Sequence, residues 1–196
     1  MKKISSLLII SGLFFVLLGA AVLIGTFLPV IKIETKYQLE KNSNNINQEI
    51  KPIDENFGII IPKIGANAKV IANVDPNDES KYQNALTMGV AHAKGTALPD
   101  VPEGNTFLFS HSSVNFWEAT RYNSIFYLLS KLETGDEIQL FYKGQKYTYK
   151  VTDKKVVSPS EVSYLQSNGN KKTLTLMTCT PAGTTINRLI ITAELL

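Results

Sequence analysis

The sequence predicts a mostly β protein: a single closed or nearly closed β-barrel of seven to eight strands with one or two short helices, preceded by an N-terminal transmembrane helix. Short β-rich runs separated by glycine and proline follow one another from residue 57 to the end of the chain. A barrel of such strands leaves no edge exposed. An uncharged apolar stretch opens the chain, and one clear hairpin pattern lies near residue 144.

The N-terminal stretch predicts a membrane anchor over residues 1–31. No charged residue occurs from Ile4 to Ile31, and a helix needs about 20 apolar residues to cross a bilayer. Lys2 and Lys3 precede the stretch, and basic residues favour the cytoplasmic side. We therefore expect a single-pass protein of the cell membrane with a cytoplasmic N-terminus and an extracellular folded domain. A cleaved signal peptide is the alternative, and it also implies export.

Residues 32–56 are expected to form an extracellular stalk or linker. The segment Lys41–Glu49 is rich in asparagine and offers little to bury. Residues 57–196 then form the predicted barrel, a length sufficient for one substantial core.

The strands of the barrel follow from local patterns. In residues 145–151, Tyr147, Tyr149 and Val151 alternate with polar residues, and Lys143-Gly144 supplies a tight turn after residues 137–142. Residues 125–132 lack alternation and predict a helix. The remaining predicted strands are residues 57–65, 68–74, 104–112, 173–179 and 187–196.

Charge and ligand spacing exclude several function classes. Two of the 20 basic residues, Lys2 and Lys3, precede residue 32, which leaves 18 basic residues against 17 acidic ones in the exported part. This near-neutral balance gives no sign of the excess of basic residues that nucleic-acid-binding domains carry. Two histidines and one cysteine provide no metal-ligand spacing, so no metal or cofactor is expected.

Cys179 is the single cysteine of the sequence. Exported proteins usually use cysteines in pairs, so Cys179 is either a buried small hydrophobe or a reactive thiol. Thiol catalysis needs a proton-transferring partner and an oxyanion donor. Cys179 and His111 end predicted strands, and Arg188 begins the last one. The three could meet at one rim of a barrel, although each could also be merely packed or solvated.

The motifs taken together favour a reactive thiol at Cys179 over a buried small hydrophobe. Residues 173–179 (TLTLMTC), then Thr-Pro-x-Gly-Thr at 180–184 and Arg188 before Leu-Ile-Ile, resemble the catalytic segment of sortases. Residues 62–71 (PKIGANAKVI), 85–99 (ALTMGVAHAKGTALP) and 131–140 (KLETGDEIQL) resemble successive segments of the sortase barrel, in the same order. The resemblance covers about residues 57–196.

The resemblance implies a cysteine transpeptidase. Such an enzyme cleaves an LPXTG-like sorting signal between Thr and Gly through a thioester and passes the acyl group to an amine of a cell-wall precursor or a pilin lysine. By position, Cys179 would be the nucleophile, His111 the proton-transferring partner and Arg188 the oxyanion stabiliser. Thr178 would shape the substrate groove, and His92 would be a structural or substrate-side group. The implied partners are surface proteins or pilins that carry the sorting signal.

The sortase class and two rival functions stay open. The Thr-Pro after Cys179 resembles pilin-polymerising class C enzymes, whose lid carries an Asp-Pro-aromatic motif. Here Asp75-Pro76 lies inside the domain and Asn77 follows it, so a lid-less enzyme closer to class D or E is the runner-up. An exported cysteine hydrolase would use the same residues. A non-catalytic, membrane-tethered peptide-binding barrel would not need Cys179.

Overall fold

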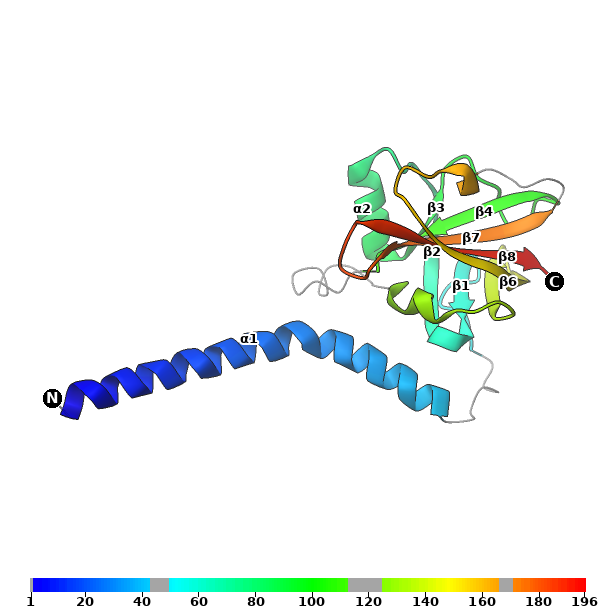
Figure 1. Ribbon diagram of the computed structural model, residues 1–196. Helices are drawn as coiled ribbons and strands as arrows, with labels where there is room; N and C mark the ends of the chain where they lie inside the picture. Colours follow the sequence, from blue (N-terminus) through cyan, green and yellow to red (C-terminus); the bar gives the residue numbers. More distant parts are fainter. Residues whose placement is uncertain (1, 43–49, 113–124, 166–170) are drawn as a thin grey trace.

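The computed structural model describes residues 2–42, 50–112, 125–165 and 171–196, and in these ranges eight strands close into a barrel beside a long helix (Figure 1). The strands are β1 (Phe57–Ile61), β2 (Ala66–Val74), β3 (Val90–Ala93), β4 (Gly104–Phe109), β5 (Glu137–Tyr142), β6 (Gln145–Val157), β7 (Lys172–Thr180) and β8 (Asn187–Leu195). The helices are α1 (Lys2–Asn42) and α2 (Glu79–Met88), with 3-10 turns η1 (Pro62–Ile64), η2 (Tyr127–Lys131) and η3 (Ser163–Leu165). The predicted mostly β, closed barrel is confirmed.

The strand order around the barrel is β1-β2-β3-β4-β7-β8-β6-β5, and β5 pairs with β1 to close it. Neighbouring strands are antiparallel except β2 with β3 and β4 with β7, which run parallel. Parallel neighbours place their carboxyl ends at the same edge of a sheet. The β4–β7 pair therefore brings together two segments that lie about 70 residues apart in the chain.

The interior of the barrel is filled by alternating side chains of every strand. Leu174 and Leu176 of β7 are fully buried there, and so is Tyr149 of β6. Burial raises the pKa of the Tyr149 phenol to about 12, since an apolar interior disfavours the charged phenolate. Other fully buried members of this cluster are Ile59, Ile61, Leu108, Phe126, Leu129, Leu132, Ile138 and Leu140.

The predicted hairpin is present as β5 and β6. Lys143 and Gly144 both have positive φ, 52° and 76°, which is the geometry of a type I′ turn. Strand β6 runs on to Val157, further than predicted, with a register shift between Val151 and Asp153. The helix predicted over residues 125–132 is a 3-10 turn of five residues, η2.

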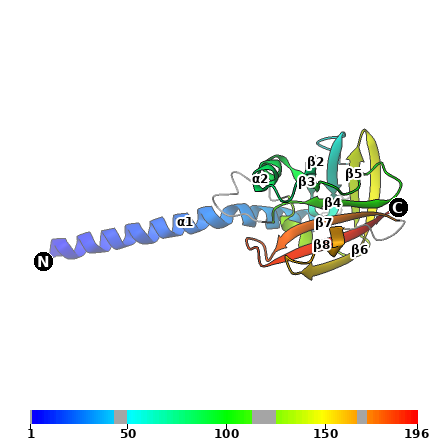
Figure 2. The same cartoon turned by 90° about the horizontal axis from the view of Figure 1, so that it is seen from above.

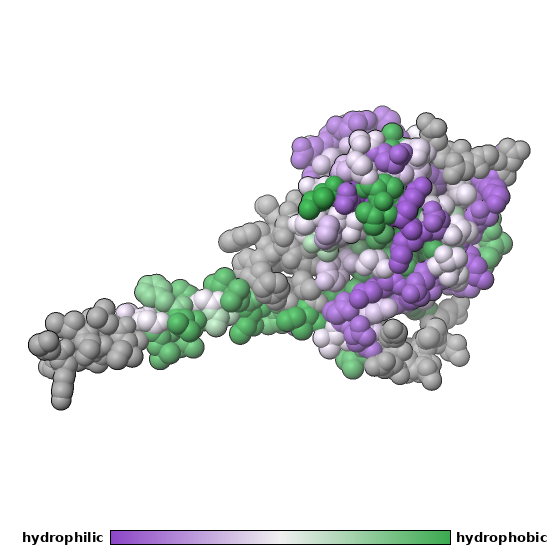
Figure 3. Space-filling model, in the orientation of Figure 1, coloured by the Kyte–Doolittle hydropathy of each residue, from purple (hydrophilic) through white to green (hydrophobic). Residues whose placement is uncertain are grey.

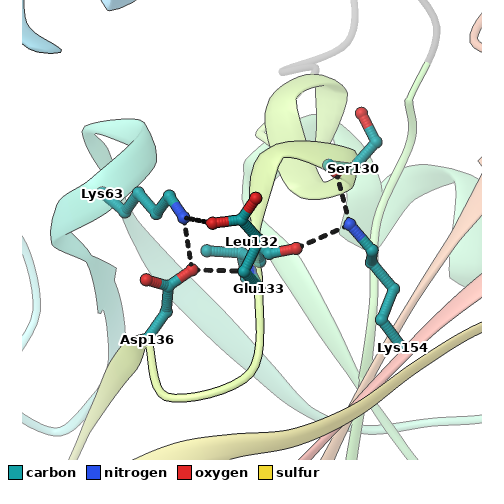
Figure 4. A network of polar contacts seen from close by, with 6 residues as sticks. All are labelled: Lys63, Ser130, Leu132, Glu133, Asp136 and Lys154. Atoms are coloured by element: carbon teal, nitrogen blue, oxygen red, sulfur yellow. Dashed lines mark hydrogen bonds and ion pairs between the residues drawn. The ribbon is translucent and has the colours of Figure 1, made fainter.

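A polar network fastens the segment between η2 and β5 to its neighbours (Figure 4). Lys63 of η1 lies 2.9 Å from a carboxylate oxygen of Glu133 and 2.8 Å from one of Asp136. Burial opposes the charge of Lys63, but the two carboxylates outweigh it and raise its pKa. On the other side, Lys154 of β6 donates to the carbonyl oxygens of Ser130 and Leu132, at 3.0 and 2.8 Å.

The C-terminal part of α1 packs against the barrel at η2. Tyr37 is 8% exposed and belongs to the interior cluster, against which Ile33 also packs. Lys131 of η2 lies 3.1 Å from a carboxylate oxygen of Glu34 and 5.6 Å from the centre of the Tyr37 ring. Residues 32–42 of the predicted stalk are thus helical. Residues 43–49 of the predicted asparagine-rich linker lie outside the described residues.

The N-terminal part of α1 extends away from the barrel (Figure 2). Its described side chains are apolar and exposed, whereas the barrel presents many polar side chains (Figure 3). Within the described part of the chain, no helix has both the length and the apolar character that a membrane crossing needs. The structure therefore does not support the predicted transmembrane helix.

Candidate active site

Cys179 and Arg188 lie directly opposite each other on β7 and β8. Residues paired in this way on antiparallel strands project to the same face, with Cβ atoms about 4.5–5.5 Å apart. Both residues are partly exposed. The residues between the two strands turn back through Thr184, whose amide and hydroxyl both donate to the carbonyl oxygen of Pro181. The Arg188 guanidinium donates to the carbonyl oxygens of Thr185 and Asn187, at 3.0 and 3.3 Å, so its charge lies at the end of β8 next to this turn.

His111 follows β4, the parallel neighbour of β7. The register pairs Phe109 with Met177, and the ladder continues for one bond because the Ser110 amide donates to the Met177 carbonyl at 3.2 Å. Extending this register by two residues sets His111 level with Cys179 and on the same face. The structure therefore brings all three candidate catalytic residues to one end of β4, β7 and β8.

Thr178 ties these strand ends together. Its side chain is 3% exposed and lies on the face opposite to that of Cys179. Its hydroxyl donates to the carbonyl oxygen of Ser110 at 2.8 Å. This bond joins the residue before the candidate nucleophile to the residue before the candidate histidine. The contact fixes the backbone of the site, while a direct contact of Thr178 with substrate stays a prediction.

The outer face that carries Cys179 is mainly apolar. Met177 and Ile190 pair across β7 and β8 next to the Cys179–Arg188 pair, and Phe109 lies beside Met177 on β4. Tyr164 of η3 stacks on Phe107 of the same face, with ring centres 6.0 Å apart. Most of these side chains are buried against one another in the outer cluster, and Met177 is partly exposed beside Cys179.

A small hollow of about 90 Å³ lies further along the same face. It is lined by hydroxyl, amide and ammonium groups, from Asn105, Lys155, Ser163, Tyr164, Thr173, Thr175 and Thr192. Thr175 precedes Cys179 by four residues on the same face, a separation of roughly 13 Å along a strand. Burial raises the pKa of the Tyr164 phenol, and the charge of Arg188 acts on it in the opposite direction. The hollow thus lies on the same face of β7 as Cys179.

His92 is enclosed in the barrel wall. It is 0% exposed, and its Nδ1 lies 3.2 Å from the amide nitrogen of Asn73. An amide only donates, so Nδ1 accepts and the proton lies on Nε2, which donates to the Ala97 carbonyl 3.1 Å away. Thr96 Oγ1 lies 3.0 Å from the same Nε2. Burial lowers the pKa of His92, so the ring is held neutral in a structural position.

Gln83 of α2 was not found by sequence reasoning. Its Oε1 lies 3.3 Å from Nε2 of His111. No pattern in the sequence links residue 83 to residue 111, because the contact depends on how α2 packs over β2 and β3. As for metal sites, the described ranges hold no group of three His, Cys, Asp or Glu side chains placed to share an ion.

Comparisons with known proteins show which family the chain belongs to. The family model of the Sortase domain matches residues 59–196. The chain is 29% identical to Sortase D of Bacillus subtilis over 121 residues, which are 62% of this chain and 52% of that protein, so it spans about half of that relative's length.

Solved structures of sortases are also similar to this chain. Sortase C-1 from Actinomyces oris is similar with a TM-score of 0.62 and 27% identity, over 83% of this chain and 97% of that one. A Clostridium perfringens Sortase D5 transpeptidase is similar with a TM-score of 0.58 and 27% identity, over 84% and 94% of the two chains. Structures with class C and class D names thus match about equally well, and the class stays open.

Proposed function

This chain belongs to the sortase family, and from that premise we propose that it is a cysteine transpeptidase that cleaves an LPXTG-like sorting signal between Thr and Gly. The acyl part would be joined to an amine of a cell-wall precursor or of a pilin lysine. The observation that carries the proposal is the register that sets Cys179 opposite Arg188 and level with His111. Sortases are cysteine transpeptidases, and this chain has a single cysteine.

In the first step the Cys179 thiolate attacks the carbonyl carbon of the Thr residue in the signal. A carbon–sulfur bond forms, and the negative charge develops on the former carbonyl oxygen. Arg188 lies on the same face, and its guanidinium offers N–H donors to that oxyanion. When the carbon–nitrogen bond breaks, His111 gives a proton to the leaving Gly amine, and a thioester remains on Cys179.

In the second step an amine attacks the thioester. His111, now neutral, takes the proton that the incoming amine loses as the new amide bond forms. The thiolate of Cys179 leaves and the enzyme returns to its starting state. Water in place of the amine would give a free Thr carboxylate, which is the hydrolase alternative.

The acyl part of the signal would lie along the outer face of β7. Four extended residues span roughly 13 Å, which is the separation of Cys179 from Thr175 on that face. The Leu-Pro-X-Thr segment would therefore reach from Cys179 over Met177 to the edge of the hollow. Met177 is the partly exposed apolar side chain of β7 next to Cys179, and it suits contact with an apolar side chain of the signal.

The membrane location is part of the proposal and rests on the sequence from Ile4 to Ile31. The described side chains of α1 between Ile10 and Ile31 are largely apolar and exposed, and exposed apolar surface of this extent marks an interaction site. Fractionation of cells that express the full chain would test this location. Recovery of the protein in the soluble fraction, without any detergent, would contradict it.

The activity is tested with the full chain in detergent, because Tyr37 and Ile33 of α1 pack against the barrel. The enzyme is incubated with a library of Leu-Pro-X-Thr-Gly peptides and a panel of amines that includes triglycine, and the products are followed by mass spectrometry. Cys179→Ala and His111→Leu serve as matched variants. We expect cleavage after Thr, a thioester on Cys179 and an amine-joined product.

The products distinguish a transpeptidase from a hydrolase and from a non-catalytic binding barrel. A free Thr carboxylate with every amine would support the hydrolase. An intact library without any adduct on Cys179 would support a binding barrel and contradict the transpeptidase. Full activity in Cys179→Ala would remove the nucleophile from the proposal.

A further inference from the structure

Helix α2 presents Gln83 to His111, across 28 residues of sequence. The amide oxygen Oε1 of Gln83 lies 3.3 Å from Nε2 of His111. An amide oxygen only accepts hydrogen bonds, so the proton of this contact belongs to Nε2. Hydrogen bonds of catalytic groups are commonly long in ligand-free structures and shorten when substrate binds. The contact defines both the tautomer and the direction of the imidazole ring.

The position of Gln83 is itself firmly held by three contacts of α2. At the N-terminus, the side chain of Asp78 accepts from the Lys81 amide at 3.1 Å and caps the helix. In the middle, Ala85 and Leu86 are each 3% exposed and pack in the outer cluster with Phe109.

At the C-terminus of α2, Gly89 leaves no room for a side chain, because a Cβ there would collide with the Lys69 carbonyl of β2. Gln83 is therefore presented from a helix that is fixed at both ends and packs on the barrel through Ala85 and Leu86. A side chain in this position can hold a ring in place, whereas one on a loose loop could not.

We propose that Gln83 is a positioning residue that orients the His111 imidazole for proton transfer at the Cys179 thioester. The proposal rests on the proposed function, since it assumes that His111 moves the proton. A third group that orients the base is a general feature of nucleophile–base pairs. Gln83 fills this place with a neutral acceptor, so it fixes the ring without adding a full negative charge beside it. His111 makes this contact two residues beyond the end of β4.

The decisive variants are Gln83→Met and Gln83→Glu in the full chain. Methionine keeps the length and approximate volume of the side chain but removes the acceptor, whereas glutamate keeps an acceptor oxygen at the same distance. With an internally quenched Leu-Pro-Ala-Thr-Gly peptide and triglycine as the amine, we expect kcat of Gln83→Met to fall about tenfold, as the loss of one hydrogen bond allows. The KM should stay within about twofold, and Gln83→Glu should stay within about threefold of the wild type in kcat.

A spectroscopic readout tests the contact without any substrate. The chain has two histidines, so the ring signals of a ¹⁵N-histidine-labelled protein are few, and His111→Leu assigns them. We expect the Nε2–H signal of His111 to weaken through faster solvent exchange in Gln83→Met and to persist in Gln83→Glu. The ring signals of His92 should not change in either variant and serve as the internal control.

Several results would overturn the proposal. Unchanged His111 signals in Gln83→Met would show that the contact does not order the ring. An equal fall of kcat in both variants would assign Gln83 a packing role, as would an equal fall in their melting temperatures. If His111→Leu itself kept full activity, the proposed function would fail instead, and the NMR result would still decide whether Gln83 orders the ring.

Discussion

His92 lies on β3 and His111 lies just beyond the neighbouring strand β4, yet the surroundings of the two rings are opposite. His92 of β3 pairs with Leu108 of β4 and is fully buried, with both ring nitrogens engaged by β2 and by the turn after β3. His111 lies three residues beyond Leu108, past the end of β4, and is partly exposed beside Gln83. The His92 ring contacts the Asn73 amide, the Ala97 carbonyl and the Thr96 hydroxyl, whereas the His111 ring contacts the Gln83 side chain.

The difference shows what makes a histidine available for chemistry. His92 supports the backbone: it accepts from Asn73, whose φ of 56° lies in the left-handed region, at a register shift between β2 and β3. Asparagine tolerates this conformation better than most residues. His111 instead lies two residues beyond the end of β4, at a partly exposed position where its ring contacts Gln83 of α2. We read the first region as structural and the second as functional.

Replacing either histidine by leucine gives the largest expected difference in transpeptidation rate. His111→Leu should lower the transpeptidation rate about 10²- to 10⁴-fold, the range of a lost general acid–base group. His92→Leu should keep near wild-type activity per folded molecule, because its ring is enclosed in the barrel wall. Initial rates with the quenched peptide, normalised to the folded fraction from circular dichroism, measure both. A larger loss of activity in His92→Leu would reverse the comparison.

The stability of the same two variants should show the reverse order. His92→Leu removes an acceptor from Asn73 and a donor from the Ala97 carbonyl, which should lower the free energy of unfolding by about 1–3 kcal/mol. His111→Leu lies at a partly exposed position and should change it by no more than about 0.5 kcal/mol. Urea unfolding followed by circular dichroism compares the two. Equal losses would mean that His111 is as structural as His92.

The link between β7 and β4 can be weakened selectively with Thr178→Val. The change keeps the side-chain shape but removes the hydroxyl that donates to Ser110, and it should cost about 1 kcal/mol of stability. If Thr178 acts by fixing the backbone before His111, kcat should fall with little change in KM. A rise in KM alone would instead support the substrate contact predicted from the sequence.

The matched control is Thr175→Val on the same strand. Thr175 is 2% exposed, and its hydroxyl donates to Asn105 at 2.9 Å, so a similar loss of stability is expected. It does not touch the backbone next to His111, and kcat should therefore be less affected than in Thr178→Val.

Sequence reasoning reached the barrel through local patterns, and it reached the three candidate residues through the resemblance of their motifs to the catalytic segment of sortases. The alternation in β6 and the Lys143-Gly144 turn predict a hairpin without knowledge of the fold. The period of two residues along β7 also places Cys179 on one face and Thr178 on the other. These relations are fixed by backbone geometry alone.

The missed features depend on contacts that no local pattern encodes. Helix α2 has a polar sequence with two buried side chains, Ala85 and Leu86, and periodicity does not mark so small a buried face. Gln83 and Tyr37 face the barrel because of how α2 and α1 pack on it. The helix expected over residues 125–132 is shortened to η2 because its apolar side chains are buried between α1 and the barrel.

The smallest expected contrast is in the pH dependence of stability. Burial lowers the pKa of His92 below its ordinary value of 6.5, so the unfolded chain binds this proton more readily than the folded one. Stability from this residue is therefore present above about pH 6.5 and is lost as the pH falls below it, with a slope of at most about 1.4 kcal/mol per pH unit for one proton. Urea unfolding of the wild type at pH 7.5 and 5.5 should show this loss, and His92→Leu should show less of it. Thr178→Val, which removes no titrating group, is the control and should keep the wild-type slope; if His92→Leu kept that slope as well, the loss of stability would not come from this ring.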